Sequence, residues 1–172
     1  MTNPCLHFEL NEAWILDGKD PVGDDRALRA NTAKEISDVR EYVEHDSQAR
    51  LTLRYSGGIA DDGRFLLHGP SEWYHENGSV QRKASYQLGR LTGLEKFYDA
   101  QSILMWTRDH REDGSMVWTT YWPDGKIRTR SNWRDSHAES TAILNDPSGK
   151  EIYRVEFERG LPISESGDPG EY

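Results

Sequence analysis

Residues 69–93 read GPSEWYHENGSVQRKASYQLGRLTG, and this stretch decides the fold. A short aromatic segment around Trp73 leads into the pair Asn77-Gly78. Both residue types accept positive backbone φ angles, so the pair favours a type I′ hairpin turn. A longer segment then runs to a second turn at Gly89. The stretch therefore predicts two strands and two turns, with no room for a helix.

The same pattern recurs further along the chain in three columns whose steps are 24, 23 and 24 positions. They are a turn column (Gly78, Ser102, Gly125, Gly149), an aromatic column (Tyr86, His110, Trp133, Phe157) and a second turn column (Gly89, Asp113, Ser136, Gly160). Because the second copy lacks both glycines, we expect it to be degenerate, with Ser102 outside the turn geometry of Gly78. Stacked copies predict a mainly β protein, a single twisted antiparallel sheet of β-hairpin repeats.

The first copy resembles the MORN-repeat variant family, which includes bacterial antitoxin-like and immunity-type proteins. The residues that match are Gly69, Trp73, Tyr74, Asn77, Gly78, Tyr86, Gly89 and Gly93. The resemblance covers roughly residues 51–160 and weakens after the first copy. It implies a sheet of stacked hairpins, in which the glycines have structural roles. The expected structural turn residues are Gly78, Gly89, Gly93, Gly125 and Gly149.

The first fifty residues have a different pattern. Alternating apolar residues around Phe8 predict a strand or hairpin. Residues 32–45 begin with a capping box, and Ile36, Val39 and Val43 in this segment fall on one helical face. We therefore expect a helix over residues 32–45, acting as a cap on the open end of the sheet.

Charge is spread unevenly over the 172 residues. The formal net charge of −9 divides into −5 over residues 1–50, −1 over residues 51–160 and −3 over residues 161–172. We expect three parts with these bounds: a strand and helix cap, the repeats, and an acidic flexible tail. The acidity disfavours binding to nucleic acid or to an anionic membrane, and it favours a basic protein partner.

The single cysteine, Cys5, cannot form an intramolecular disulfide or a cysteine-rich zinc site. No apolar run approaches the ~20 residues of a transmembrane helix. The N-terminus has neither the basic region nor the apolar region of a signal peptide. We therefore expect a cytoplasmic protein without metal or cofactor, unless a leader ahead of Cys5 has been removed.

The charged residues suggest little catalytic chemistry. The histidines show no metal-binding spacing. Asp109, Glu112 and Asp113 flank His110 and could form an acid/base cluster, although a turn of the degenerate repeat explains them better. We expect no enzyme, and we keep an enzyme or a carbohydrate-binding aromatic ladder as alternatives.

Four tryptophans lie within 28 residues, and each is explained at least as well by the core of a thin sheet as by a binding surface: Trp106, Trp118, Trp122 and Trp133. Trp and Tyr beside charged groups are typical of protein interfaces. The partner-binding candidates are Tyr98, Trp106, Asp109, Glu112, Asp113, Trp118 and Trp122. We expect a non-catalytic protein-binding module, most specifically a bacterial immunity or antitoxin-like protein that occludes a basic toxin. A structural or targeting scaffold in a larger assembly is the alternative.

Overall fold

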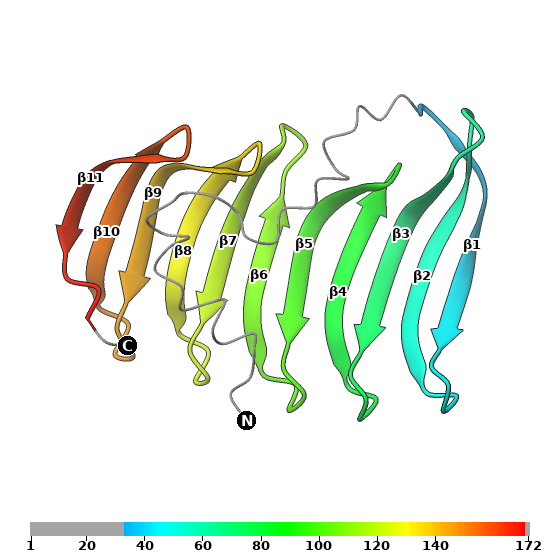
Figure 1. The fold of residues 1–172 in the computed structure, drawn as a ribbon, viewed down its shortest axis with the longest axis horizontal. Helices are drawn as coiled ribbons and strands as arrows, with labels where there is room; N and C mark the ends of the chain where they lie inside the picture. The colour runs from blue at the N-terminus through cyan, green and yellow to red at the C-terminus, as the bar shows by residue number, and fades with distance from the viewer. Residues whose placement is uncertain (1–32, 171–172) are drawn as a thin grey trace. The chain divides into compact units, whose positions relative to one another are not determined.

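The computed structural model describes residues 33–170, where every regular element is a β-strand (Figure 1). The strands fall into two compact units, an N-terminal unit that ends at Arg111 and a C-terminal unit whose described part begins at Glu112. The N-terminal unit contains β1 (Ile36–His45), β2 (Leu51–Ala60), β3 (Phe65–Tyr74), β4 (Val80–Gln87), β5 (Arg90–Tyr98) and β6 (Leu104–His110). The C-terminal unit contains β7 (Ser115–Tyr121), β8 (Ile127–Arg134), β9 (His137–Asn145), β10 (Glu151–Glu158) and β11 (Leu161–Gly167).

Each unit is an antiparallel meander in which every strand pairs with the next one along the chain. In the N-terminal unit this pairing runs from β1 to β6. In the C-terminal unit it runs from β7 to β11. Successive side chains along a strand therefore point to opposite faces. The prediction of a mainly β protein made of stacked antiparallel hairpins is confirmed.

The helix predicted over residues 32–45 is wrong, because Ile36–His45 form strand β1. This strand pairs with β2, and the ring of Tyr42 stacks on the ring of Tyr55 with 5.3 Å between their centroids. Pairing with a neighbouring strand outweighs the local helix signal. There is accordingly no helical cap within the described residues, and the strand predicted around Phe8 lies outside them.

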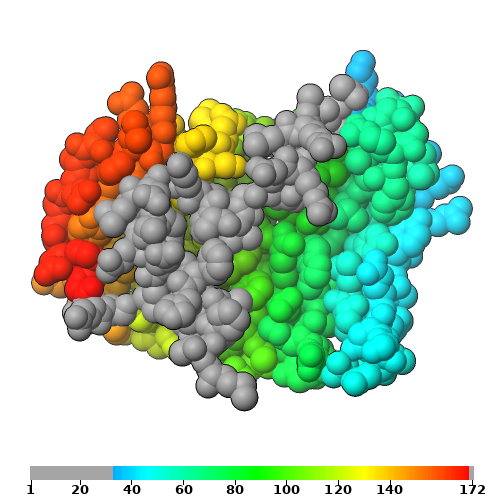
Figure 2. Space-filling model, viewed as in Figure 1, coloured from blue at the N-terminus to red at the C-terminus, as the bar shows by residue number. Residues whose placement is uncertain are grey.

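The apolar residues of β1 have a helix-like spacing because the strand contains a bulge. The register shifts between Ser37 and Arg40, and Asp38 has a left-handed φ of 50°. The bulge interrupts the alternation, which places the apolar residues three and four positions apart. Val39 and Val43 are exposed rather than buried. Figure 2 shows side chains of β1, at the blue end of the colour scale, extending from the edge of this unit.

Residues 69–110 and 116–157 are two equivalent copies with an offset of 47 positions. Nearly all of their cross-strand pairs correspond: Trp73 lies opposite Arg82, and Thr120 lies opposite Thr129. The register shifts also recur at the offset. The offset equals two of the steps found in the sequence, so the structural unit of duplication is a pair of hairpins.

One class of hairpin loop recurs along one edge of each unit (Figure 1). In these loops the amide of the first residue donates to the carbonyl of the fifth, and the amide of the fourth donates to the carbonyl of the first. The fourth residue is left-handed, as a three-residue loop with a bulge requires. The loops are 46–50, 75–79, 99–103, 122–126 and 146–150, and their left-handed residues are Ala49, Gly78, Ser102, Gly125 and Gly149.

Two predictions about these turns are wrong. Gly78 has a φ of 83°, but Asn77 does not have a positive φ, so the pair does not form a type I′ turn. Ser102 was expected to lie outside this geometry, yet it has a φ of 64° and both backbone hydrogen bonds of the loop. The loop closes without glycine because its left-handed position is accessible to other residues at an energetic cost.

Two-residue turns with consecutive left-handed residues, the type I′ signature, occur elsewhere. They join β4 to β5, β8 to β9 and β10 to β11. Their left-handed pairs are Leu88-Gly89, Asp135-Ser136 and Arg159-Gly160. The second turn column of the sequence therefore marks the type I′ turns, with Asp113 as its exception.

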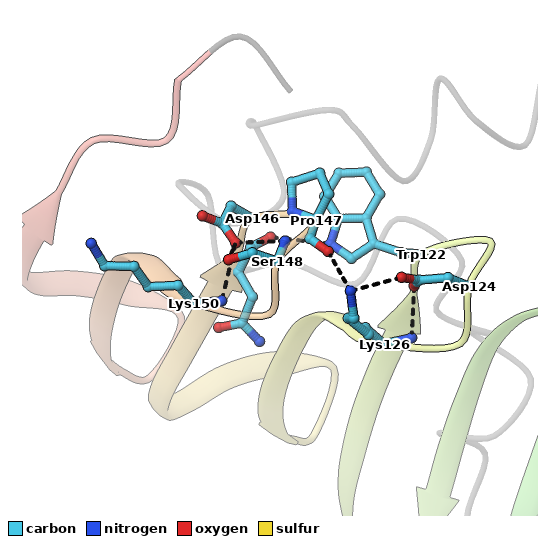
Figure 3. A network of polar contacts seen from close by, with 8 residues as sticks. Trp122, Asp124, Lys126, Asp146, Pro147, Ser148 and Lys150 are labelled. Carbon is cyan, nitrogen blue, oxygen red and sulfur yellow. Dashed lines mark hydrogen bonds and ion pairs between the residues drawn. The ribbon is translucent and has the colours of Figure 1, made fainter.

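Neighbouring loops are tied together in the same way in both copies. In the C-terminal unit, Trp122 Nε1 donates to the carbonyl of Asn145 at 3.3 Å, and Lys126 Nζ donates to the carbonyl of Pro147 at 3.0 Å (Figure 3). In the N-terminal unit, a ring nitrogen of His75 lies 2.9 Å from the Tyr98 carbonyl oxygen. Asn77 Nδ2 donates to the carbonyl of Ala100 at 2.7 Å. Different residue types thus make equivalent contacts along this edge.

The expected domain limits do not separate the compact units. Strand β1 pairs with β2, so no boundary follows residue 50, and the units divide instead after Arg111. The tail expected to be irregular from residue 161 begins with edge strand β11, which pairs with β10. Tyr153 Oη donates to Glu165 Oε2 at 2.9 Å, which ties the side chains of these two strands together.

Candidate functional site

One face of strands β3 to β6 carries an unusual mixture of aromatic and charged side chains. Trp73 lies opposite Arg82, and Arg82 lies opposite Phe97 on the next strand. Phe97 in turn lies opposite Trp106. Directly opposed residues share a face, so these side chains form one row across four strands. All of them are partly exposed.

Glu95 is the centre of a charged cluster beside this row. It is only 2% exposed. Arg82 Nε donates to Glu95 Oε1, and a ring nitrogen of His110 lies 2.8 Å from Glu95 Oε2. Arg108, which is 6% exposed, lies directly opposite Glu95 on β6. We call Arg82, Glu95, Arg108 and His110 the Glu95 cluster.

The cluster keeps Glu95 ionised. Burial alone would raise the pKa of this carboxyl, because a charged group is less stable away from water. The hydrogen bond with His110 and the positive charges of Arg82 and Arg108 act in the opposite direction and outweigh burial. The pKa of Glu95 is therefore below its ordinary value. Removing any of these partners would leave buried charge uncompensated.

Aromatic rings hold the arginines in place. The guanidinium carbon of Arg82 lies 4.3 Å from the centroid of the Trp73 ring, and that of Arg108 lies 5.2 Å from the Trp106 ring. Phe97 and Trp106 stack with 5.2 Å between centroids and an angle of 5° between their planes. Cation–π contacts and stacking fix the orientation of long side chains that would otherwise sample many rotamers.

The second copy has the same strand pairing but different side chains at the equivalent positions of this face. At the offset of 47, Glu95 and Arg108 correspond to Ala142 and Val155, which also lie directly opposite each other. The corresponding positions in the second copy hold small, apolar or aromatic side chains. Arg82 corresponds to Thr129 and His110 to Phe157. These four counterparts are all buried.

The Glu95 cluster therefore replaces the buried side chains that the same framework uses in its other copy. Buried charge costs desolvation free energy, and it is not needed for folding where an apolar pair does the same job. Local departures of this kind are expected at functional sites. We therefore regard the face around Glu95 as the candidate functional site.

The structure separates the residues that the sequence proposed as partner-binding candidates. Trp106 belongs to the site, where it stacks on Phe97. Trp118 is 4% exposed and packs in the core of the C-terminal unit, 6.0 Å from Trp133, so it is not available to a partner. Trp122 lies at the start of a hairpin loop, with Arg128 4.5 Å from its ring.

The remaining candidates do not join the cluster. Tyr98 is the residue after Phe97 on β5 and so points to the opposite face. Asp109, Glu112 and Asp113 are exposed. Asp113 accepts hydrogen bonds from Ser115 and Arg134. His110 contacts Glu95, and the acid/base cluster with the three flanking acids was only the less favoured alternative to a turn.

Sequence reasoning missed Arg82, Glu95 and Arg108. In the alignment with steps of 24, 23 and 24, the neighbouring hairpins set Glu95 against Ser71 and Trp118, which share no residue type with each other. The offset of 47 compares equivalent hairpins and sets Glu95 against Ala142 and Arg108 against Val155. A comparison of the sequence with itself at 47 positions could therefore have identified these residues.

Among the described residues there is neither a metal-binding group nor a helix that could span a membrane. Residues 33–170 contain no group of three or more histidine, cysteine or acidic side chains placed to hold a metal ion. The same part of the chain has no helix with the length and apolar character to span a membrane.

Comparisons with known proteins agree with the repeats. The sequence model of the MORN repeat variant matches residues 67–88 and 116–135. These segments are related by the structural offset, because each contains the first hairpin of one copy. No curated protein gives a significant match. The chain therefore contains MORN-type repeats in these two segments.

The similarities to solved structures are low. A GtfA/B complex bound to UDP and GlcNAc is 18% identical, with a TM-score of 0.26 over 78% of this chain and 28% of that one. A protein of unknown function from Bacteroides fragilis NCTC 9343 is 9% identical, with a TM-score of 0.20 over 81% of this chain and 95% of that one. The chain thus spans 28% of the GtfA/B chain that it matches. Neither similarity carries a functional argument.

Proposed function

We propose that the chain is a non-catalytic protein-binding module whose contact surface is the face around the Glu95 cluster. The observation that carries the proposal is the exchange of the buried pair Ala142 and Val155 for Glu95 and Arg108 at equivalent positions. A fold gains nothing from this exchange, whereas a binding surface gains specificity from charges that only a complementary partner can satisfy.

The composition of the face supports this role. Trp73, Arg82 and Trp106 are of the residue types that dominate binding energy at protein interfaces. They are fixed by stacking and ion pairing before any partner arrives. A surface that is already ordered loses less conformational entropy on association.

The most specific form of the proposal is a bacterial immunity or antitoxin-like protein that masks a basic toxin. It rests on the resemblance of the repeats to the MORN-repeat variant and on the net charge of −9. Opposite net charges would accelerate the encounter of the two proteins. The ordered face would then cover the functional surface of the toxin. A scaffold in a larger assembly is the alternative, and a toxin gene beside this one would distinguish the two.

The test compares the wild-type chain with a variant that carries the second copy's residues. The variant combines Arg82→Thr, Glu95→Ala, Arg108→Val and His110→Phe, which are the residues at 129, 142, 155 and 157. Binding to the product of the neighbouring gene is measured by surface plasmon resonance. The proposal predicts at least a tenfold faster dissociation for the variant, with its far-ultraviolet spectrum unchanged.

A matched control places four changes on the opposite face of the same strands. Lys83→Thr, Lys96→Thr, Asp109→Asn and Glu72→Gln alter charge without touching the Glu95 cluster, because these residues point to the opposite face. The control should bind as the wild type does. Equal loss in both variants, or no loss in either, would contradict the assignment of the binding face.

A further inference from the structure

Arg82 is held rigidly from one side only. Its Nε donates to Glu95 and its guanidinium lies 4.3 Å from the Trp73 ring. Its side chain is 26% exposed. The other end of the guanidinium carries Nη1 and Nη2, and within residues 33–170 these nitrogens have no hydrogen-bonding or ion-pairing partner.

Arg82 is also the member of the cluster that can accept a further partner. Glu95 fixes its Nε and the Trp73 ring lies against its guanidinium, so the edge with Nη1 and Nη2 is ordered and partly exposed. A charged group that is partly removed from water gains from an opposite charge, because the surrounding protein screens it less than water does.

We propose that the Nη atoms of Arg82 bind the carboxylate of an Asp or Glu side chain of the partner protein. This inference rests on the proposed function and names the chemistry of its anchor. A guanidinium presents parallel N–H groups that match the two oxygens of a carboxylate.

A carboxylate is the expected anion because it is the anionic group of unmodified protein side chains. A phosphate monoester, with about −1.5 to −2 charges at neutral pH, would require a modified partner and would bring more negative charge next to Glu95. The basic character expected of the partner as a whole concerns long-range attraction to a chain of net charge −9. The anchor at Arg82 concerns contacts at short range, and the two are compatible.

The test uses nuclear magnetic resonance of the full chain with ¹⁵N-labelled arginine side chains. The signals of Arg82 are those that disappear in Arg82→Lys. The probes are three capped tripeptides: Ala-Glu-Ala, Ala-Gln-Ala and Ala-phosphoserine-Ala. We expect the Glu peptide to shift the Arg82 signals in a saturable way, and the Gln peptide to leave them in place at the same concentrations.

Two variants make the result specific. Arg82→Lys keeps the charge but loses the paired N–H groups, so affinity for the Glu peptide, followed on Arg108, should fall at least tenfold. Exposed Arg90 lies on β5 outside the cluster, and Arg90→Lys should leave the affinity unchanged. Equal shifts at Arg82 and Arg90, no saturation, or tighter binding of the phosphoserine peptide would overturn the proposal.

The outcome separates this inference from the proposed function. If the neighbouring gene's product binds and Arg82→Lys binds it as tightly as the wild type, the carboxylate anchor is wrong and the binding module stands. If the four-residue variant, which also lacks Arg82, keeps full affinity for that protein, the proposed binding face and the anchor at Arg82 are both wrong.

Discussion

Ser102 and Gly149 occupy the same position of the same hairpin loop, 47 residues apart, and both have left-handed backbone, with φ angles of 64° and 92°. The two loops also share their pair of backbone hydrogen bonds. Serine at this position carries a Cβ that crowds the neighbouring carbonyl, which glycine avoids. The N-terminal unit therefore contains a strained loop where the C-terminal unit has a relaxed one.

Ser102→Gly should accordingly stabilise the protein. Relief of left-handed strain is worth about 1–2 kcal/mol, and the added freedom of glycine in the unfolded chain removes about 0.4–1 kcal/mol of that gain. We expect a net increase of about 1 kcal/mol in the free energy of unfolding of the N-terminal unit, measured by urea denaturation.

The reverse change at Gly78 is the control. A Cβ built at Gly78 would meet no heavy atom within 4 Å, so Gly78→Ser introduces strain without a clash. It should lower the free energy of unfolding by about 1 kcal/mol. If both substitutions shift stability in the same direction, the loop geometry at Ser102 is misassigned.

The lowered pKa of Glu95 predicts how stability depends on pH. A carboxyl whose folded pKa is below its unfolded pKa contributes stability that is present above the unfolded value. This contribution is lost as pH falls from about 4.5, the ordinary value, through the lower folded pKa. We expect Glu95→Gln to reduce the slope of stability against pH below that value, in thermal melts of wild type and variant recorded between pH 6 and 3.

Glu95→Gln should also destabilise the protein at neutral pH. Loss of one member of a buried ion pair typically costs about 3–5 kcal/mol, because the remaining charges stay buried. Glu76→Gln is a suitable control, since the Glu76 side chain is 89% exposed. The control should stay within about 0.5 kcal/mol of the wild type. A Glu95 variant as stable as the control would contradict the role of Glu95 as the centre of the cluster.

The four-residue variant that imports Thr, Ala, Val and Phe at positions 82, 95, 108 and 110 should behave differently from Glu95→Gln. Replacing a complete buried charge cluster by apolar groups is often neutral or stabilising by about 1–4 kcal/mol. We therefore expect a thermal midpoint at or above that of the wild type. If the variant folds normally but binds its partner more weakly, the charges of the cluster contribute to binding and are not needed for stability.

The repeats could be predicted from the sequence because turns and aromatic residues are spaced along the chain itself. The strands of residues 51–160 follow from such spacing, which is why they were found. Strand β1 was not found, since its bulge at Asp38 gives the apolar residues a helical period, and only pairing with β2 decides its structure. Local signals are weak where tertiary pairing decides.

The candidate site was found only in part for a related reason. Trp106 was identified by its residue type, but nothing in the sequence distinguishes Glu95 and Arg82 from charged residues at the surface. Their contact depends on the register between β4 and β5, in which Arg82 lies opposite Phe97. Ser102 shows the opposite error, because its residue type suggested a departure from the Gly78 loop, whereas its backbone has the same hydrogen bonds and the same left-handed φ.

Trp118→Ala should affect folding rather than binding. Trp118 is 4% exposed and lies against Trp133, so its removal opens a cavity in the C-terminal unit. Such changes typically cost about 3–5 kcal/mol. The substitution should lower the thermal midpoint, whereas Trp106→Ala on the partly exposed face should cost less stability and speed dissociation from a partner. Equal thermal midpoints for the two variants would contradict this division.

Deletion of the chain after Gly160 should destabilise the C-terminal unit. The deletion removes β11, its backbone hydrogen bonds to β10 and the acceptor of the Tyr153 hydroxyl on Glu165. It would also leave β10, which contains Val155 and Phe157, as an unprotected edge strand, a situation that favours aggregation. We expect a lower thermal midpoint and self-association in analytical ultracentrifugation.

Because the deletion removes a strand and negative charge together, it cannot show which of the two losses affects binding. Glu165→Gln combined with Asp168→Asn removes two negative charges and keeps β11, because a glutamine oxygen can still accept the hydrogen bond from Tyr153. If acidity at this end steers a basic partner, the double variant should associate more slowly at low salt and dissociate at the wild-type rate. The difference should shrink at 0.5 M salt, where charges are screened within a few ångströms. A change confined to the dissociation rate would instead place β11 in the contact surface.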